Sequence, residues 1–379
     1  MRRPAAAVLA VLPLVAGQAA AQLAVSANDN KVLNVDGATV VQPGVADTVT
    51  LLDFGSSPPR VLAEVKAPAS VVGPPQSVAI APDESIALVT ASTKIDPADP
   101  KKTTSDDKLS VIDLKADPPA VIATLQAGLG ATGVSFNPAG TLALVANRDE
   151  GTVSIFKVSG KTVTPAGKLP LGDAKSGPCH VAFLPDGKRA LVTRDGDHRV
   201  SVLAIDGDNV TDTKKVMAGG LRPYSLEVSP KGDVAVFGNA GGGQGDVDFV
   251  SVIDLKAMRV VNHVPVGQTP EAVGMSADGG YVAVTVMNGS NRARSHPAFN
   301  DYGLVKVYRI DGTNLALAAE ARVGHWCQGA AWSRDDKTLV VQCMVEKDLE
   351  TFAFDGQSLR RTGEVKLSGG PAGIRVSTK

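Results

Sequence analysis

The stretch PCHVAFLPDGKRALVTRDGD, residues 178–197, determines the fold. An alternating apolar run from Pro178 to Phe183 is followed by Pro185-Asp186-Gly187 and by a second apolar run from Ala190 to Thr193. Proline presets φ and glycine accepts positive φ, so the middle of the stretch predicts a tight turn. We therefore expect the whole stretch to form a β-hairpin.

The same hairpin pattern recurs along the chain. Copies begin at Pro75, Ala131, Pro178, Pro223, Pro270 and Cys327, and a partial copy begins at Pro371. Successive starts are 56, 47, 45, 47, 57 and 44 residues apart, close to the ~40–50 residues of one propeller blade. Each complete hairpin is followed by two more strand-like runs. Each unit is therefore predicted to be a four-stranded blade, with strands named A to D from the centre outwards.

The two ends of the chain share one blade. The seventh A strand, Ala372 to Val376, has no B, C or D strand after it. Leu23 to Asn28 resembles the B strand at Leu142 to Asn147, and residues 47–54 and 60–65 supply strands C and D. The sequence thus predicts an all-β fold, a seven-bladed β-propeller closed by N-terminal strands B–D and C-terminal strand A, which removes the free edges of the ring.

We expect residues 1–21 to be a signal peptide and residues 22–379 to be a single propeller domain. A basic start precedes an apolar run from Ala5 to Val15 that is too short to span a bilayer, and Ala19 to Ala21 is an A-x-A cleavage site. These features predict a periplasmic or secreted protein without a membrane span. The net charge of −1, with no basic runs, argues against nucleic acid as a partner.

Three long B–C connections are predicted, at residues 92–108, 240–248 and 287–303. In a propeller the B–C and D–A connections share one face, and the short A–B turns lie on the other. Long loops on a rigid scaffold often carry binding residues, although each could also be a tolerated insertion. We expect a small-molecule ligand or a periplasmic protein to bind on this loop-rich face.

The starts of the A strands open on the same face, around the axial channel. Polar residues here could simply line a water-filled channel. They could also converge on a bound ligand as hydrogen-bonding groups. His180 follows one ring position and adds an imidazole. The aligned ring consists of Gln76, Thr132, Cys179, Tyr224, Glu271, Gln328 and Ala372.

Two arginines follow the B strands of neighbouring blades. Arg148 and Arg194 could hold a carboxylate or phosphate between their guanidinium groups. The alternative is that they form surface ion pairs with Asp149, Glu150 and Asp197.

The cysteines predict one disulfide. Cys327 begins an A strand and Cys343 ends the following B strand, so a cross-strand bridge is reasonable in an oxidising compartment. A register shift of one residue would instead put the two side chains on opposite faces. Cys179 is left as a small buried channel residue. No spacing of histidine or cysteine typical of a metal site occurs, and no nucleotide fingerprint, so we expect neither a metal nor a cofactor.

The repeat, with its most faithful copy ANRDEGTVS at residues 146–154, resembles the YVTN-type propeller repeat over essentially the whole mature chain. That repeat occurs in exported YncE-like proteins, which bind rather than catalyse, and it is similar to that of the lactonase family. The lactonase resemblance implies a glutamate, a histidine and arginines at the channel mouth. Glu271, His180 or His198, Arg148 and Arg194 are the residues that could take these roles. Amine-dehydrogenase heavy chains share the architecture and act as scaffolds.

These observations lead to three hypotheses of function. The first is a non-catalytic exported propeller that binds a ligand or partner on its loop-rich face. The second is a lactone hydrolase or cyclase, with Glu271 as acid or base. The third is a scaffold subunit of a periplasmic oxidoreductase.

Overall fold

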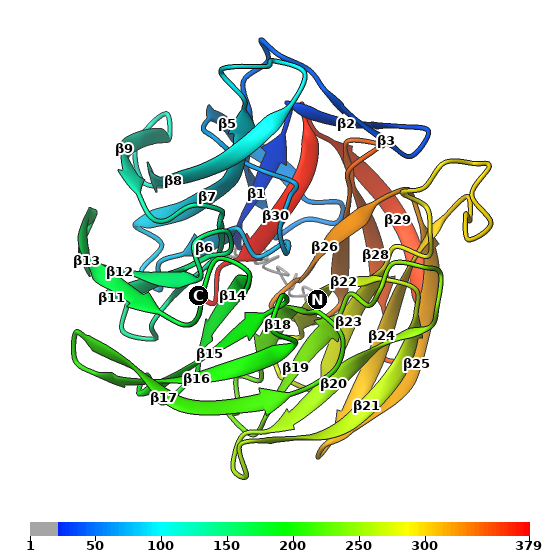
Figure 1. Ribbon diagram of the computed structural model, residues 1–379. Coiled ribbons are helices and arrows are strands. Elements are labelled where there is room, and N and C mark those ends of the chain that lie inside the picture. The colour runs from blue at the N-terminus through cyan, green and yellow to red at the C-terminus, as the bar shows by residue number, and fades with distance from the viewer. Residues whose placement is uncertain (1–21) are drawn as a thin grey trace, which may run out of the picture.

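The computed structural model describes residues 22–379, and the predicted signal peptide lies outside these residues. Seven four-stranded antiparallel sheets surround a central channel, and a separate two-stranded sheet projects from one of them (Figure 1). This confirms the predicted seven-bladed β-propeller. Residues 22–379 contain no helix, and so none long and apolar enough to cross a membrane.

The blades are numbered along the chain, and their strands run from A at the channel to D at the rim. Blades 1 to 4 consist of β6 (Val78–Ile80), β7 (Ile86–Ile95), β8 (Thr103–Asp113) and β9 (Ala120–Gln126); β10 (Ala131–Phe136), β11 (Leu142–Asn147), β12 (Thr152–Ser159) and β13 (Thr162–Pro170); β14 (Pro178–Phe183), β15 (Arg189–Arg194), β16 (Arg199–Asp206) and β17 (Asn209–Ala218); β18 (Pro223–Val228), β19 (Val234–Asn239), β20 (Asp248–Asp254) and β21 (Arg259–Gly267). Blades 5 to 7 consist of β22 (Pro270–Met275), β23 (Tyr281–Val286), β24 (Gly303–Asp311) and β25 (Asn314–Val323); β26 (Cys327–Trp332), β27 (Thr338–Cys343), β28 (Asp348–Phe354) and β29 (Leu359–Lys366); β30 (Gly370–Val376), β1 (Leu23–Asp29), β4 (Thr48–Asp53) and β5 (Arg60–Lys66).

Burial along each strand follows its place in the blade. The B strand β11 is buried at all six positions, because neighbouring blades cover both of its faces. The D strand β9 alternates between exposed and half-buried residues, as expected for a strand at the rim. The apolar core consequently lies between blades. One cluster, for example, joins Ile86 and Leu88 of blade 1 to Val145 and Phe156 of blade 2.

Blade 7 closes the ring as predicted. The C-terminal strand β30 pairs antiparallel with β1, with Ala24 opposite Val376 and Ser26 opposite Ile374. Figure 1 shows the red β30 beside the blue β1. The first and last described strands of the chain therefore share one sheet.

Two of the B–C connections differ from the prediction. Residues 92–108 are not a long loop, because β7 and β8 continue as a paired hairpin with Thr93 opposite Ser105 and Ile95 opposite Thr103. The β-branched residues in both arms favour this extension. A further projection, the hairpin of β2 (Val32–Val35) and β3 (Ala38–Val41), was not predicted, although Asp36-Gly37 is a typical two-residue hairpin turn.

The predicted disulfide is confirmed. Cys327 and Cys343 are direct cross-strand partners, their Cα atoms lie 4.0 Å apart, and their sulfur atoms are bonded. Cys179 is a buried free cysteine.

We predict that removing the disulfide lowers the free energy of unfolding by about 3 kcal/mol, because the bridge closes a loop of 16 residues in the unfolded chain. Urea unfolding of the wild type with and without dithiothreitol measures this difference. The Cys327→Ala/Cys343→Ala double variant is the control, since the reductant should not change its stability. Equal stability of the oxidised and reduced wild type would contradict the prediction.

Candidate functional site

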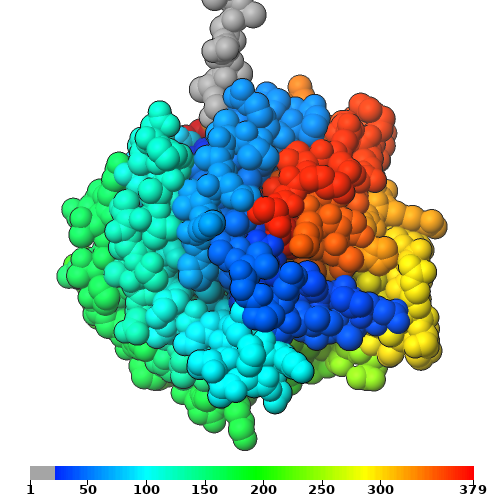
Figure 2. Space-filling view, turned by 90° about the horizontal axis from the view of Figure 1, so that it is seen from above, coloured from blue at the N-terminus to red at the C-terminus, as the bar shows by residue number. Residues whose placement is uncertain are grey.

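Two faces of the ring differ in construction. We call the face of the B–C and D–A connections the loop face, and the face of the A–B and C–D connections the turn face. On the loop face the β2–β3 hairpin of blade 7 reaches loop 287–302 of blade 5, where Asn34 Nδ2 donates to Asn291 O at 2.9 Å and Arg294 N donates to Asp36 Oδ1 at 2.9 Å. Figure 2 shows the dark-blue hairpin reaching the yellow residues across the face of the orange-red blade.

The same loop also contacts blade 4. Arg292 Nη2 donates to the carbonyl of Gly243 in the B–C connection of that blade. Gly37 fits against the loop only because it has no side chain, since a Cβ there would lie 2.0 Å from Ala293 N. Three of the projections on the loop face are therefore joined and hold one another in place.

The channel opening on this face, which we call the upper mouth, is lined by charged side chains from three blades. Arg148 follows β11, Asp195 follows β15 and Arg222 precedes β18. Arg148 binds Asp195 through two hydrogen bonds, from Nε to Oδ1 at 3.3 Å and from Nη2 to Oδ2 at 2.5 Å. Arg222 Nη2 lies 3.7 Å from the same Oδ2, too far for a good hydrogen bond. Among the described residues, the Arg222 guanidinium group makes no hydrogen bond.

Glu271, the second residue of β22, is buried beside these arginines. Its side-chain atom Oε2 has no hydrogen-bond partner among the described residues. Burial raises the pKa of Glu271 to about 8, although the charges of Arg222 and Arg148 act in the opposite direction. The carboxyl group is therefore mostly protonated at pH 7 and can donate a hydrogen bond.

Two other ring residues lie close to Glu271 and the arginines. Burial, followed by the charge of Glu271, raises the pKa of the Tyr224 hydroxyl well above its usual range. Burial raises the pKa of the Cys179 thiol to about 12, and Cys179 Sγ lies 3.4 Å from Pro223 O. Because the thiolate is the reactive form of cysteine, this position suits a buried channel residue and not a nucleophile.

The remaining polar residues of the ring are buried, and only some of their polar atoms form hydrogen bonds. Gln76 Nε2 donates to Val273 O at 3.5 Å, and Gln328 Nε2 donates to Val71 O at 3.2 Å. The Oε1 atoms of both glutamines lack partners among the residues of the described chain. Thr132 Oγ1 donates to Ala146 O at 3.2 Å and is engaged with its own blade. The ring thus keeps spare acceptor atoms near the axis.

Three of the residues predicted from the sequence do not join this group. His180 is fully buried and packs against Gly133 of the preceding blade, where a Cβ on Gly133 would lie 2.4 Å from His180 Nδ1. Burial and Arg375 lower its pKa well below the usual range, so it is a neutral residue of the interior. Arg194 forms an ion pair with Asp197 of its own blade and donates a hydrogen bond to Ser201 Oγ at 3.1 Å. This matches the alternative in which the arginine forms an ion pair within the protein. His198 is exposed, and its Nδ1 accepts the Arg222 backbone N–H at 3.3 Å.

Sequence reasoning missed Arg222. The residue before the A strand has positive φ in five blades: these residues are Gly130, Gly177, Arg222 with a φ of 58°, Thr269 with 58° and Trp326 with 47°. A non-glycine residue in the left-handed region is uncommon and costs about 1–2 kcal/mol. Arg222 is the one charged residue among these five, and this charge was the signal in the sequence for it.

The described residues contain one group with the spacing of a metal site, Cys343, Asp348 and Glu350. Cys343 is already bonded in the disulfide, and Lys366 Nζ lies 2.8 Å from Asp348 Oδ2. Glu350 Oε1 accepts the Gly324 backbone N–H at 3.0 Å. Since the thiolate is lost and both carboxylates have partners, we assign no metal to this group.

Comparison with known proteins identifies the fold but no family. No family model matches the chain. One curated protein, Antigen Lp49 of Leptospira interrogans, is 31% identical over 111 residues, and this match covers 28% of the chain and 23% of that protein. The chain thus matches less than a quarter of the length of this relative.

Solved structures align with nearly all of the chain. A "putative 6-phosphogluconolactonase" from Bacteroides uniformis has a TM-score of 0.71 at 14% identity, covering 94% of this chain and 99% of that one. A periplasmic gluconolactonase from Pseudomonas aeruginosa has a TM-score of 0.67 at 17% identity, with 94% and 99% covered. Hydrazine synthase from Kuenenia stuttgartiensis has a TM-score of 0.63 at 17% identity, with 81% and 90% covered. At these identities the likeness shows the propeller fold alone.

Glu271 makes the stability of the protein depend on pH. Between the ordinary pKa near 4.5 and the raised value of about 8, the folded protein holds a proton that the unfolded chain has lost. The contribution of Glu271 to the free energy of unfolding is therefore greatest below pH 4.5. It falls by about 1.4 kcal/mol per pH unit between pH 4.5 and pH 8. We predict that Glu271→Gln removes this pH dependence. The free energy of unfolding of the variant should therefore increase relative to that of the wild type as the pH rises.

Urea unfolding at pH 5, 6, 7 and 8 tests this prediction. Glu320→Gln, at an exposed position of β25, is the matched control and should run parallel to the wild type. Parallel curves for Glu271→Gln and the wild type would show that Glu271 is ionised in the folded protein.

Proposed function

We propose that this protein is an exported, YVTN-type propeller that binds a small carboxylate-bearing ligand at the upper mouth without transforming it. The observation that carries the proposal is Arg222, whose guanidinium group makes no hydrogen bond to the described residues and whose Nη2 lies 3.7 Å from Asp195 Oδ2. Arginine has five N–H donors in a planar fork that matches a carboxylate.

The charges around Arg222 favour an anion. Asp195 is engaged by Arg148 through two hydrogen bonds, and Glu271 is neutral at pH 7. Burial raises the pKa of Asp248, and the smaller effect of the Arg222 charge lowers it. Asp248 forms no ion pair with Arg222 within 4.0 Å in the described chain, and its Oδ2 accepts the Thr269 N–H at 2.8 Å. A ligand carboxylate could accept hydrogen bonds from Arg222 and from the protonated Glu271 carboxyl.

The loop face also offers apolar surface for the rest of a ligand. Eight of the fourteen exposed large apolar residues lie in B–C or D–A connections, and the other six lie on D strands at the rim. This one-sided distribution supports the loop face as the binding face. The eight are Val35, Val40, Val45, Val72, Leu129, Leu221, Val247 and Val345.

Export is part of the same proposal. The predicted signal peptide, the Cys327–Cys343 bridge and a periplasmic gluconolactonase among the structural neighbours agree with a location outside the cytoplasm. A periplasmic protein partner on the loop face, including the scaffold role in an oxidoreductase, is an alternative that the hydrazine synthase likeness keeps open as a proposal.

A second candidate, lactone hydrolysis, is favoured by the neutral carboxyl group of Glu271. A protonated carboxyl beside arginines can act as a general acid. Water would attack the lactone carbonyl carbon and pass a proton to Asp195, while Glu271 would protonate the ring oxygen as the carbon–oxygen bond breaks. Arg222 would stabilise the negative charge that develops on the carbonyl oxygen. The product would be the corresponding hydroxy acid.

We predict that Arg222→Gln weakens the binding of a small carboxylate roughly 10- to 100-fold, as expected for the loss of one charge-assisted hydrogen bond. Isothermal titration with gluconate, 6-phosphogluconate and benzoate measures the affinity, and the neutral sugar and amide analogues are controls. Affinity should also fall as the pH rises through about 8, because Glu271 then ionises and repels the ligand. Arg199→Gln, at an exposed position at the start of the C strand β16, should bind like the wild type, and an equal loss in both variants would refute the assignment.

The lactone hypothesis predicts turnover that depends on the Glu271 proton. In a pH-stat assay with a panel of small lactones, the rate should drop as the pH rises above about 8 and should be lost in Glu271→Ala. Glu271→Gln should also be inactive although it keeps the shape of the side chain. Equal inertness of the wild type and both variants would contradict the lactone hypothesis.

A further inference from the structure

The turn face carries a cavity that the sequence did not predict. Two neighbouring hollows, of about 380 and about 460 Å³, open at the lower end of the channel. Each is large enough for a small organic ligand. They share six lining residues and so form one vestibule with two halves. The shared residues are Glu227, Val228, Pro230, Arg375, Val376 and Thr378.

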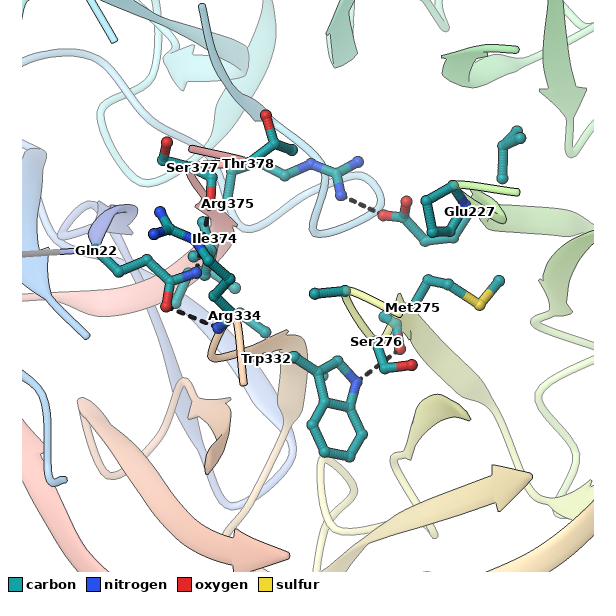
Figure 3. Close-up of a pocket in the computed structure, with 17 residues that line it drawn as sticks. Gln22, Glu227, Met275, Ser276, Trp332, Arg334, Ile374, Arg375, Ser377 and Thr378 are labelled. Carbon is teal, nitrogen blue, oxygen red and sulfur yellow. Dashed lines mark hydrogen bonds and ion pairs between the residues drawn. The ribbon is translucent and has the colours of Figure 1, made fainter. Parts of the chain in front are cut away.

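An ion pair across the channel separates the two halves. Arg375 of β30 and Glu227 of β18 come from blades on opposite sides of the ring, and Arg375 Nη1 donates to Glu227 Oε1. Figure 3 shows the arginine reaching across to the glutamate. This is the one hydrogen bond that the guanidinium group makes to the described residues, so its other N–H groups remain able to bind a ligand.

The smaller half combines an apolar wall with two arginines. Trp332, Met275 and Ile374 form the wall, and the Trp332 ring is fixed because its Nε1–H donates to Gly274 O at 3.0 Å (Figure 3). Arg334 stands at the solvent edge, where its backbone N–H donates to Gln22 Oε1 and its exposed side chain forms no ion pair with a described residue. With Arg334 and Arg375 against Glu227, the lining carries a net charge of +1.

We propose that this half of the vestibule is a second binding site, for a small organic carboxylate with an apolar or aromatic body. The body would pack on Trp332 and Met275, and the carboxylate would accept hydrogen bonds from Arg375 and Arg334. This site is separate from the upper mouth and does not depend on the function proposed there.

Glu227 competes with such a ligand for Arg375. Burial raises the pKa of Glu227 although Arg375 lowers it, so the glutamate can take up a proton when a second carboxylate arrives. Gln76, His180 and Ser377 are uncharged neighbours of the pair, and Glu84 is engaged by Ser377 and Lys115. Removing the charge of Glu227 should therefore strengthen binding.

The two tryptophans of the chain report on the two ends of the channel separately. Trp332 lines the vestibule, whereas Trp326 packs with Val32 and Met344 on the loop face. The probe is 4-bromobenzoate, whose bromine quenches tryptophan fluorescence, and 4-bromobenzamide is its uncharged control. We expect saturable quenching in Trp326→Phe, which keeps Trp332, and at least 10-fold weaker binding of the amide.

Three variants in the Trp326→Phe background complete the test. Glu227→Gln should bind 4-bromobenzoate several-fold more tightly, a gain that misfolding cannot produce. Arg375→Met should bind 10- to 100-fold more weakly, and the Arg375→Met/Glu227→Gln double variant should be equally weak without an unpaired buried charge. Arg222→Gln should have no effect. Absence of quenching in Trp326→Phe, equal affinity for the amide, or unchanged affinity in Arg375→Met would each overturn the proposal, whatever happens at the upper mouth.

Discussion

Closure of the ring by β30 and β1 is the constraint on which the rest of the structure depends. A blade packs its B and C strands against two neighbours, so an open array would leave apolar faces such as that of β11 uncovered at both ends. Pairing Ala24 with Val376 covers these faces and fixes the number of blades. It also brings Arg375 opposite Glu227, which no local contact could do.

The repeat explains why the exceptions to it are informative. At the place of Glu227 and Arg375 the other five copies have alanine, serine or glycine, small residues that let the A strands approach the axis. A large charged side chain is tolerated there only because an opposite charge lies across the channel. Arg222 takes the left-handed conformation that glycine takes before the A strands of blades 2 and 3, and that Thr269 and Trp326 take before those of blades 5 and 6. Arg222 differs from these residues by its charge, which acts on the buried Glu271.

The fold could be predicted from the sequence almost completely, and the site only in part. The spacing of the hairpins predicted the blades, the closure of the ring and the Cys327–Cys343 pair. These features follow from the apolar pattern of each hairpin and from the number of strands in each repeat. Glu271 and Arg148 lie at the same end of the channel, because the alignment of the repeats fixes their height along the axis, and their role there stays a prediction. Arg194 and His180 do not join the site, because the direction of a side chain depends on its neighbours. Asp197 binds Arg194, and Gly133 leaves space for the His180 ring between two blades.

The two ends of the channel use buried charge in different ways. In the upper mouth burial favours the neutral form of Glu271, and the Arg222 guanidinium group makes no hydrogen bond within residues 22–379, so the proposed carboxylate would not have to displace a hydrogen bond. In the vestibule the arginine already binds Glu227, so a ligand must share it or displace it. Desolvation works against both glutamates as ions. An incoming anion would therefore favour protonation of Glu227, whereas Glu271 already holds its proton at pH 7, so we expect coupling to proton uptake in the vestibule and not at the upper mouth.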